Sequence, residues 1–158
     1  RDRLRSRGLG DVYKRQKQYH SIASEIGVDT ELVPIEITES AAIDNENIKA
    51  LADRFHSKGF SLMVDDFGAG YSSLATLNMK CFDTLKIDKS LIDYIGDFSG
   101  EKLLKHTIAL AKDLGLNVTA EGVETEEQVD FLRKINCDSI QGYYYSKPLP
   151  EQEFKKLL

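Results

Sequence analysis

The chain has 158 residues, of which 41% are hydrophobic, and this length can bury one core but hardly two. Its formal net charge is −5, but residues 1–17 carry seven Arg and Lys against two Asp, so the rest of the chain is strongly acidic. No apolar run approaches the roughly 20 residues of a membrane span, no signal peptide is found, and Cys81 and Cys137 fit neither a zinc nor a disulfide pattern, which together predict a soluble cytoplasmic protein.

The basic segment at residues 1–16 has neither a helical apolar stripe nor interleaved aromatic residues. It joins the acidic body abruptly near Gln16. We therefore predict that residues 1–16 are a disordered tail or are foreign to the natural protein, and that residues 17–158 form the folded body.

From Lys17 onward, helical and strand periodicities alternate, which is typical of β/α units around a parallel sheet. Gly27, Gly59 and Gly115 each follow a helical pattern and mark its end. The predicted helices lie at about 19–26, 43–55, 74–79, 103–114, 129–135 and 150–158. The predicted strands lie at 32–37, 60–64, 84–87, 116–120 and, more weakly, 139–141.

Two adjacent carboxylates, Asp65 and Asp66, end the apolar strand at 60–64 and lead into a loop that contains Gly68 and Gly70. Neighbouring carboxylates raise each other's pKa unless a cation or hydrogen-bond donors compensate them. Mg²⁺ prefers oxygen ligands, and one carboxylate shared by two ions suits a displacement at phosphorus. An Asp-Asp pair before Gly is also an ordinary turn or helix cap, so this segment alone leaves both interpretations open.

Polar residues follow the same pattern along the chain, each at the end of a predicted strand. They are Glu36, Asp65 with Asp66, Lys86, Glu121 and Gln141. The intervals of 29, 21, 35 and 20 residues each advance the chain by about one β/α unit of roughly 30 residues. In a (β/α)₈ barrel the carboxyl ends of the strands form the active-site face, so we expect these side chains to meet at one rim.

Five segments in order carry a resemblance to a known family: IEITES at 35–40, DDFGAGYSSL at 65–74, LKID at 85–88, AEGVET at 120–125 and QGYYYSKPL at 141–149. Together they resemble the EAL-type phosphodiesterases, which hydrolyse the bacterial second messenger cyclic di-GMP. The resemblance covers residues 17–158. It implies an α/β fold, a (β/α)₈ TIM-type barrel of roughly 250 residues, of which this chain holds only the later β/α units as an incomplete barrel.

The resemblance also implies a metal site. Glu36, Asp65, Asp66 and Glu121 resemble the family's ligands of Mg²⁺ or Mn²⁺, with Asp65 similar to the carboxylate that bridges two ions. An acidic rim needs such ions to accept a substrate that carries two phosphates, because carboxylates and phosphates repel each other.

The resemblance implies further catalytic roles. Lys86 resembles the residue that hydrogen-bonds the attacking water or the developing charge, Gln141 a residue that orders water, and Glu121 an acid close to the metals. Glu39 resembles a glutamate that fixes the loop after Asp66, although an acid at a helix start beside Ser40 explains it equally well.

The expected reaction is hydrolysis of one 3′,5′ phosphodiester bond of cyclic di-GMP to give linear pGpG. The expected partners are cyclic di-GMP, a second copy of the chain through the region 66–73, and an upstream diguanylate cyclase or sensory domain. Neither a DNA partner nor a membrane segment is expected in this chain.

Two features of the family are not found in this sequence: the Glu-Ala-Leu segment and a downstream asparagine ligand. The alternative function is therefore an inactive cyclic di-GMP-binding or protein-interaction module. A second alternative is an unrelated Mg²⁺-dependent barrel enzyme that stabilises an enolate, which Lys and acids at strand ends would also suit. An assay with cyclic di-GMP separates the three: a phosphodiesterase would cleave it, an inactive binding module would bind it intact, and an unrelated barrel enzyme would ignore it.

Overall fold

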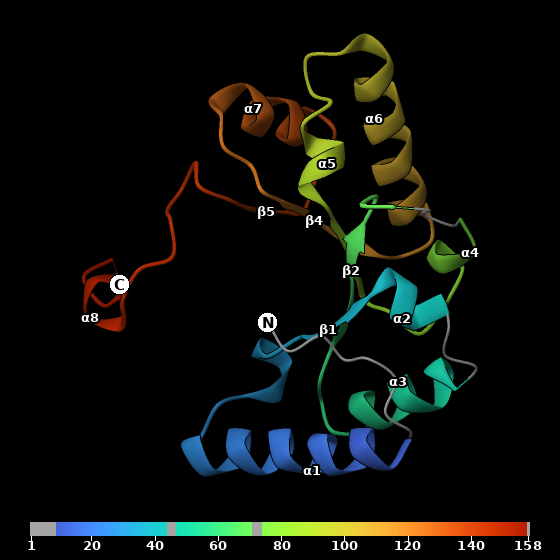
Figure 1. Cartoon of the computed structure of the whole chain (residues 1–158), viewed down its shortest axis with the longest axis vertical. Helices are drawn as coiled ribbons and strands as arrows, with labels where there is room; N and C mark the ends of the chain where they lie inside the picture. The colour runs from blue at the N-terminus through green and yellow to red at the C-terminus, as the bar shows by residue number, and fades with distance from the viewer. Residues whose placement is uncertain (1–8, 44–46, 71–73, 158) are drawn as a thin grey trace.

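The computed structural model describes residues 9–43, 47–70 and 74–157. Their core is one parallel sheet of five strands, whose spatial order follows the chain, β1-β2-β3-β4-β5 (Figure 1). The strands are β1 (Ile35–Thr38), β2 (Leu62–Phe67), β3 (Thr84–Ile87), β4 (Asn117–Glu121) and β5 (Ser139–Gln141). The predicted α/β fold with successive β/α units is confirmed, because each strand pairs in parallel with the next one along the chain.

Two strands differ in extent from the prediction. β1 begins at Ile35 because the preceding residues form a 3₁₀ turn, η1 (Thr30–Leu32), which Asp29 caps by accepting a hydrogen bond from the Glu31 amide at 3.0 Å. β2 extends to Phe67, and its register against β3 shifts between Val64 and Phe67. The two carboxylates therefore lie inside an irregular strand end rather than in the loop that follows it.

Helices connect the strands on the predicted plan. They are α1 (Leu9–Ile26), α2 (Glu39–Ile43), α3 (Ile48–His56), α4 (Leu74–Leu77), α5 (Lys89–Ile92), α6 (Phe98–Asp113), α7 (Glu126–Lys134) and α8 (Glu151–Phe154). Helix α1 crosses the predicted boundary at residue 16, the predicted helix at 43–55 corresponds to α3, and α2 before it was not predicted. Helix α5 was not predicted, since four residues are too few to show a helical period.

The two faces of the sheet differ in polarity because strand side chains alternate. One face carries buried apolar residues, such as Val64, Leu85 and Val118, each at most 1% exposed, which belong to the core under the helices. The opposite face carries the polar residues of the alternate positions. This alternation places the predicted site residues of neighbouring strands on one common surface.

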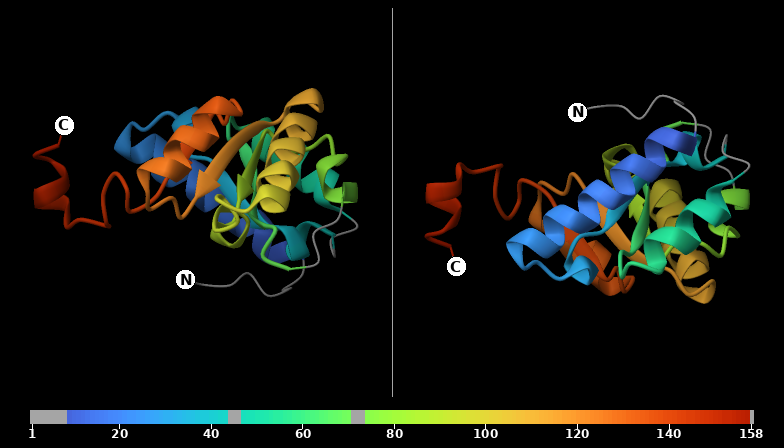
Figure 2. Two further views of the ribbon diagram at one scale, coloured as in Figure 1. Left: turned by 90° about the horizontal axis from the view of Figure 1, so that it is seen from above. Right: turned by 90° about the horizontal axis from the view of Figure 1, so that it is seen from below.

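Helix α8 and the segment before it extend away from the sheet and the other helices (Figures 1 and 2). Their apolar side chains are correspondingly exposed, as at Tyr145, Phe154 and Leu157. None of the helices in the described part of the chain has the length and apolar character needed to cross a membrane.

Candidate functional site

Lys86 of β3 is the centre of a group of charged side chains that come from four neighbouring strands. Its ammonium Nζ donates a hydrogen bond of 2.7 Å to Glu36 Oε1 of β1. The same atom lies 3.0 Å from Asp65 Oδ1 of β2 and 3.4 Å from Glu121 Oε2 of β4. The sequence prediction that these residues meet at one surface is therefore confirmed for all four.

The ammonium group of Lys86 is almost fully enclosed, with 5% of the residue exposed. Burial alone lowers a lysine pKa, but the hydrogen bond to Glu36 and the charges of Asp65 and Glu121 outweigh it, so the pKa of Lys86 is raised above its ordinary value. Lys86 is thus a permanent cation at neutral pH. Because three carboxylates surround this one cation, the group has a net negative charge and attracts further cations.

Asp65 Oδ1 is, within the described ranges, a buried side-chain oxygen without a hydrogen-bond partner. Its contact with Lys86 has the distance of an ion pair but not the alignment of a hydrogen bond. A buried oxygen in this condition needs an explanation. Lys86 supplies an ionic partner, and a hard divalent cation would be a second one, so the donor chemistry at this position fits Mg²⁺ or Mn²⁺.

The same carboxylates are not yet gathered as metal ligands. Among the described residues, no three His, Cys, Asp or Glu side chains are grouped closely enough to hold an ion as they stand. The ammonium of Lys86 lies within 3.4 Å of Glu36, Asp65 and Glu121 and so takes the place that a shared cation would need. Metal binding at this surface therefore requires the carboxylates to divide their oxygens between Lys86 and the ion.

Asp66 and Gln141 lie beside this group. Asp66 has an exposed side chain and a left-handed backbone with φ of 59°, which only a few per cent of residues other than glycine adopt. Gln141 ends β5 in direct register with Glu121. Their predicted roles as a metal ligand and a water-ordering residue stay predictions.

Glu39 is the first residue of α2 and is buried, with 7% of the residue exposed. Its Oε1 accepts a hydrogen bond of 3.2 Å from Thr76 Oγ1 of α4, the helix that follows the loop after Asp66. This contact fits the predicted link between Glu39 and that loop. The loop residues 71–73 lie outside the described residues.

Two charged residues next to the group were missed by the sequence reasoning. Lys89 Nζ lies 3.4 Å from Glu124 Oε1, and each of the two follows a predicted site residue by three positions, Lys86 and Glu121 respectively. Both lie at or directly after segments of the resemblance, so their position was the available signal. What the sequence did not show is that the two meet.

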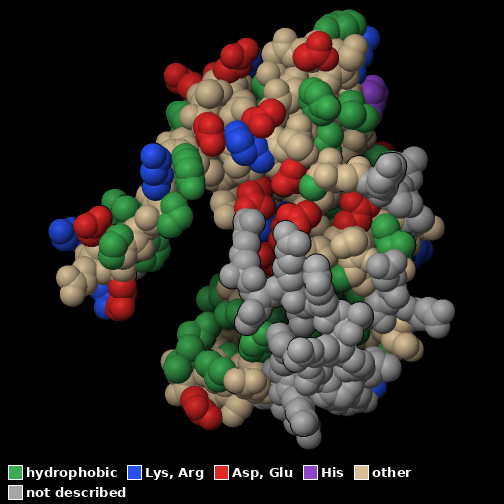
Figure 3. All heavy atoms as spheres, viewed as in Figure 1, with side chains coloured by type: hydrophobic (Ala, Val, Ile, Leu, Met, Phe, Trp, Pro, Cys, Tyr) green, Lys and Arg blue, Asp and Glu red, His purple; other side chains and the backbone are tan. Residues whose placement is uncertain are grey.

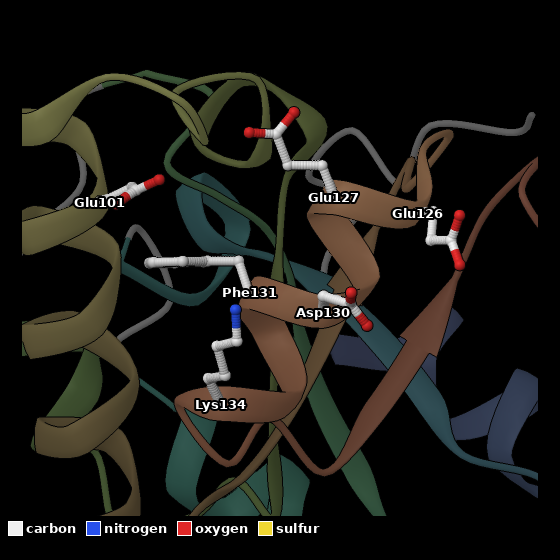
Figure 4. Close-up of a pocket in the computed structure, with 6 residues that line it drawn as sticks. All are labelled: Glu101, Glu126, Glu127, Asp130, Phe131 and Lys134. Atoms are coloured by element: carbon white, nitrogen blue, oxygen red, sulfur yellow. The ribbon is translucent and has the colours of Figure 1, made fainter.

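A separate hollow lies between α6 and α7 (Figure 4). It shares no lining residue with the Lys86 group. Its lining is mainly acidic, with one apolar ring from α7 that extends toward α6: Glu101, Glu126, Glu127, Asp130, Phe131 and Lys134. Acidic side chains also gather in the middle of the face shown in Figure 3.

Residues 13–148 match the family model described as the EAL domain. The chain is 40% identical over 136 residues to a Pseudomonas aeruginosa protein named cyclic di-GMP phosphodiesterase NbdA. This match covers 85% of the chain but 17% of NbdA, so the chain spans only a small part of that relative.

Solved structures agree in fold. The crystal structure of the EAL domain of Mycobacterium smegmatis DcpA superposes with a TM-score of 0.83 at 35% identity, over 90% of this chain and 65% of that one. Klebsiella pneumoniae BlrP1, solved as a complex with manganese and cyclic di-GMP, gives a TM-score of 0.80 at 29% identity, over 88% of this chain and 37% of that one. Because the family model matches most of this chain, residues 13–148, the chain belongs to the EAL domain family.

Proposed function

We propose that this chain forms the later β/α units of a phosphodiesterase domain that uses divalent metal to hydrolyse cyclic di-GMP to linear pGpG. The observation that carries the proposal is the group around Lys86, in which one buried cation is surrounded by carboxylates of β1, β2 and β4. NbdA, a relative at 40% identity, is named for this activity, and BlrP1 was solved with manganese and the same nucleotide.

The metal would be held by Glu36, Asp65, Asp66 and Glu121. We propose two ions, either Mg²⁺ or Mn²⁺. When bound, such ions neutralise phosphate charge and lower the pKa of a water molecule. The buried oxygen of Asp65 supports this assignment, since its contact with Lys86 is an ion pair without hydrogen-bond alignment and carboxylate oxygens suit a hard cation.

Lys86 would stabilise the charge that develops on the phosphate during attack. Its ammonium is already oriented by Glu36 and Asp65, so little reorganisation is needed when the charge appears. Gln141, in register with Glu121, would hold the water molecule through its side-chain amide. Water adds to phosphorus, the bond from phosphorus to the 3′ oxygen breaks, and the 3′ oxygen leaves with a proton.

An inactive cyclic di-GMP-binding or protein-interaction module is the second candidate. The observation that favours it is that, among the described residues, no three His, Cys, Asp or Glu side chains are grouped closely enough to hold a metal ion. A site that holds metal less tightly would lose turnover.

The remaining partner and domain assignments belong to the same proposal. They are a homodimer formed through the region 66–73, an upstream diguanylate cyclase or sensory domain, and a cytoplasmic location. The division of the chain into a tail at 1–16 and a body at 17–158 also stays a prediction, because residues 1–8 lie outside the described residues.

The test measures conversion of cyclic di-GMP to pGpG by the whole chain with Mn²⁺, monitored by chromatography. The variant is Asp65→Asn, and the matched control is Asp53→Asn on the exposed surface of α3. We expect Asp65→Asn to abolish turnover and Asp53→Asn to leave it unchanged, with circular dichroism confirming that both fold. Binding of intact nucleotide without turnover would favour the second candidate. If the folded chain neither binds nor cleaves cyclic di-GMP, the phosphodiesterase and the nucleotide-binding module are both overturned.

A further inference from the structure

Helix α5 follows β3, the strand of Lys86, after the single residue Asp88. It lies between the two loops that follow the carboxylate-bearing strands β2 and β4. Asp88 caps the helix by accepting a hydrogen bond of 2.9 Å from the Ser90 amide. The Asp88 amide in turn donates to the Phe67 carbonyl at 2.9 Å. The start of α5 is thereby attached to the end of β2, next to Asp65 and Asp66.

On the side of β4, Lys89 packs against the backbone that follows Glu121. Its Nζ lies 3.5 Å from the Gly122 carbonyl oxygen and 3.4 Å from Glu124 Oε1, and it is held from α5 itself by Asp93 at 2.9 Å. Gly122 has φ of +75°, and a Cβ atom placed on it would lie only 2.6 Å from Lys89 Cβ. The lysine stem thus contacts the backbone with no room for a side chain between them.

On the side of β2, the next two residues of α5 make equivalent contacts. Ser90 Oγ donates a hydrogen bond of 3.2 Å to the Gly68 carbonyl. Gly68 has φ of +100°, and a Cβ atom placed on it would lie 2.3 Å from Leu91 Cδ1. Both flanking loops therefore press a glycine against consecutive residues of one short helix.

The carboxylates held by these loops repel each other. Glu36, Asp65 and Glu121 repel one another but are all attracted to one ammonium within 3.4 Å, so the balance depends on how far apart their strand ends are held. An element tied to both neighbouring loops fixes that separation. Helix α5 is in a position to do so because it continues directly from β3, the strand that lies between β2 and β4.

We propose that α5 is a brace that fixes the separation of Asp65 and Glu121 around Lys86, with Lys89 as the positioning residue for Glu121 and Ser90 as the positioning residue for the loop after Asp65. This role rests on the proposed function insofar as the positioned carboxylates hold metal. Lys89 touches neither substrate nor metal in this assignment. It acts through the backbone of Gly122 and the side chain of Glu124.

The test uses the whole chain and three variants of lysine. Lys89→Met keeps most of the aliphatic stem but removes the ammonium, and Lys89→Arg keeps the charge. Lys49→Met is the matched control, because Lys49 forms the same kind of i,i+4 pair, with Asp53 at 3.3 Å, on α3 and away from the site. Ser90→Ala tests the other arm of the brace.

Amide hydrogen exchange is the first readout, because it requires neither metal nor substrate. We expect Lys89→Met to speed exchange in residues 121–125 by about tenfold, Ser90→Ala to speed it in residues 66–70, and Lys49→Met to change neither. Lys89→Arg should restore the slow exchange. Equal exchange in Lys89→Met and Lys49→Met would overturn the brace.

Mn²⁺ affinity by calorimetry and the thermal midpoint are the second readouts. A positioning role predicts that Lys89→Met weakens Mn²⁺ binding about tenfold, the lower end of the range for residues that orient metal ligands, with a thermal midpoint equal to that of Lys49→Met. Faster exchange with unchanged Mn²⁺ affinity would reduce Lys89 to a structural role and overturn the proposal. If the wild-type chain binds Mn²⁺ but does not cleave cyclic di-GMP, the proposed function fails, and the Mn²⁺ affinities of the variants still test the brace. If it binds no Mn²⁺, the proposed function fails and the exchange rates decide the brace.

Discussion

At the scale of single residues, Lys86 determines how the acidic surface is tolerated in the folded chain. The ammonium is enclosed and lies within 3.4 Å of three carboxylates, two of which are themselves partly buried. A charge left unpaired in such a place is costly, so the partners depend on one another. Lys86 accordingly has a structural role in addition to the one proposed for it in catalysis.

We expect Lys86→Met to lower the free energy of unfolding by about 2 kcal/mol in EDTA, because it leaves the three carboxylates without their cation. The pKa of Lys86 is raised in the folded state, so its contribution is complete below the ordinary lysine value of 10.5 and is lost only as the pH rises through the raised value. The loss should therefore be constant between about pH 6 and 9. Urea unfolding at several pH values measures it.

Added Mn²⁺ provides the control for this prediction. If the carboxylates hold metal, Mn²⁺ should restore more stability to Lys86→Met than it adds to the wild type, because the ion replaces the missing cation. Lys49→Met, at an exposed pair, should lose little stability and gain nothing from Mn²⁺ beyond the wild-type effect. Equal stability of Lys86→Met and Lys49→Met would contradict the role of Lys86.

At the scale of elements, the start of β5 is tied to its neighbours by Asp138. Its Oδ2 accepts a hydrogen bond of 2.9 Å from the Val118 amide of β4, and Lys112 from the last turn of α6 donates to its Oδ1. Burial raises the pKa of Asp138, but the Lys112 and Val118 hydrogen bonds outweigh it and the pKa is lowered below its ordinary 3.8.

A second aspartate makes the same connection at the start of β3. Asp83 Oδ2 accepts hydrogen bonds of 2.8 Å from the Leu62 amide of β2 and lies 2.8 Å from His56 Nε2 at the end of α3. In both units, an aspartate before a strand joins the start of the preceding strand to a basic residue at the end of a helix. At the end of the sheet opposite Lys86, the same arrangement of hydrogen bonds therefore occurs twice, at Asp83 and at Asp138.

We expect Asp138→Asn to lower the free energy of unfolding by about 1 kcal/mol at pH 7, because asparagine keeps an acceptor for Val118 but loses the charge that faces Lys112. A carboxylate with a lowered folded pKa stabilises above its unfolded pKa and loses that effect as the pH falls through the folded value. The difference from wild type should therefore shrink as the pH falls below 3.8 and disappear below the lowered pKa of the folded state. The control is Asp130→Asn on the exposed face of α7, and a pH-independent difference would contradict the ionic explanation.

The sequence predicted those elements and contacts that depend on chain order and periodicity. Glu36, Asp65, Lys86 and Glu121 could be placed together because they come from successive strands, each of which pairs with the next. The contacts of α5 could not be predicted, since they depend on left-handed backbone at Gly68 and Gly122 and on a helix of four residues. Thr76 was missed for a related reason: its bond to Glu39 joins α2 to α4 across 37 positions.

At the scale of the whole molecule, the sheet is open. In the described part of the chain, β1 and β5 each pair with one strand only, so each presents an edge. Exposed edges pair readily with other chains.

We therefore expect the chain to self-associate as its concentration rises, which sedimentation velocity at several concentrations would show. Ser139→Lys places a charge on the exposed β5 edge and should shift the association to higher concentration. Lys155→Ala, directly after α8, is the comparison variant, for which no such shift is expected. A single monomeric species at every concentration would contradict this expectation.

The chain order of the strands has a consequence for synthesis. A nascent chain leaves the ribosome from its N-terminus. In this five-stranded sheet, each new strand pairs with the strand made immediately before it. Each pair of neighbouring strands is separated by a single β/α unit, so the sheet can grow one unit at a time. The cluster around Lys86 would then be complete when Glu121 emerges, before the last part of the domain has been translated.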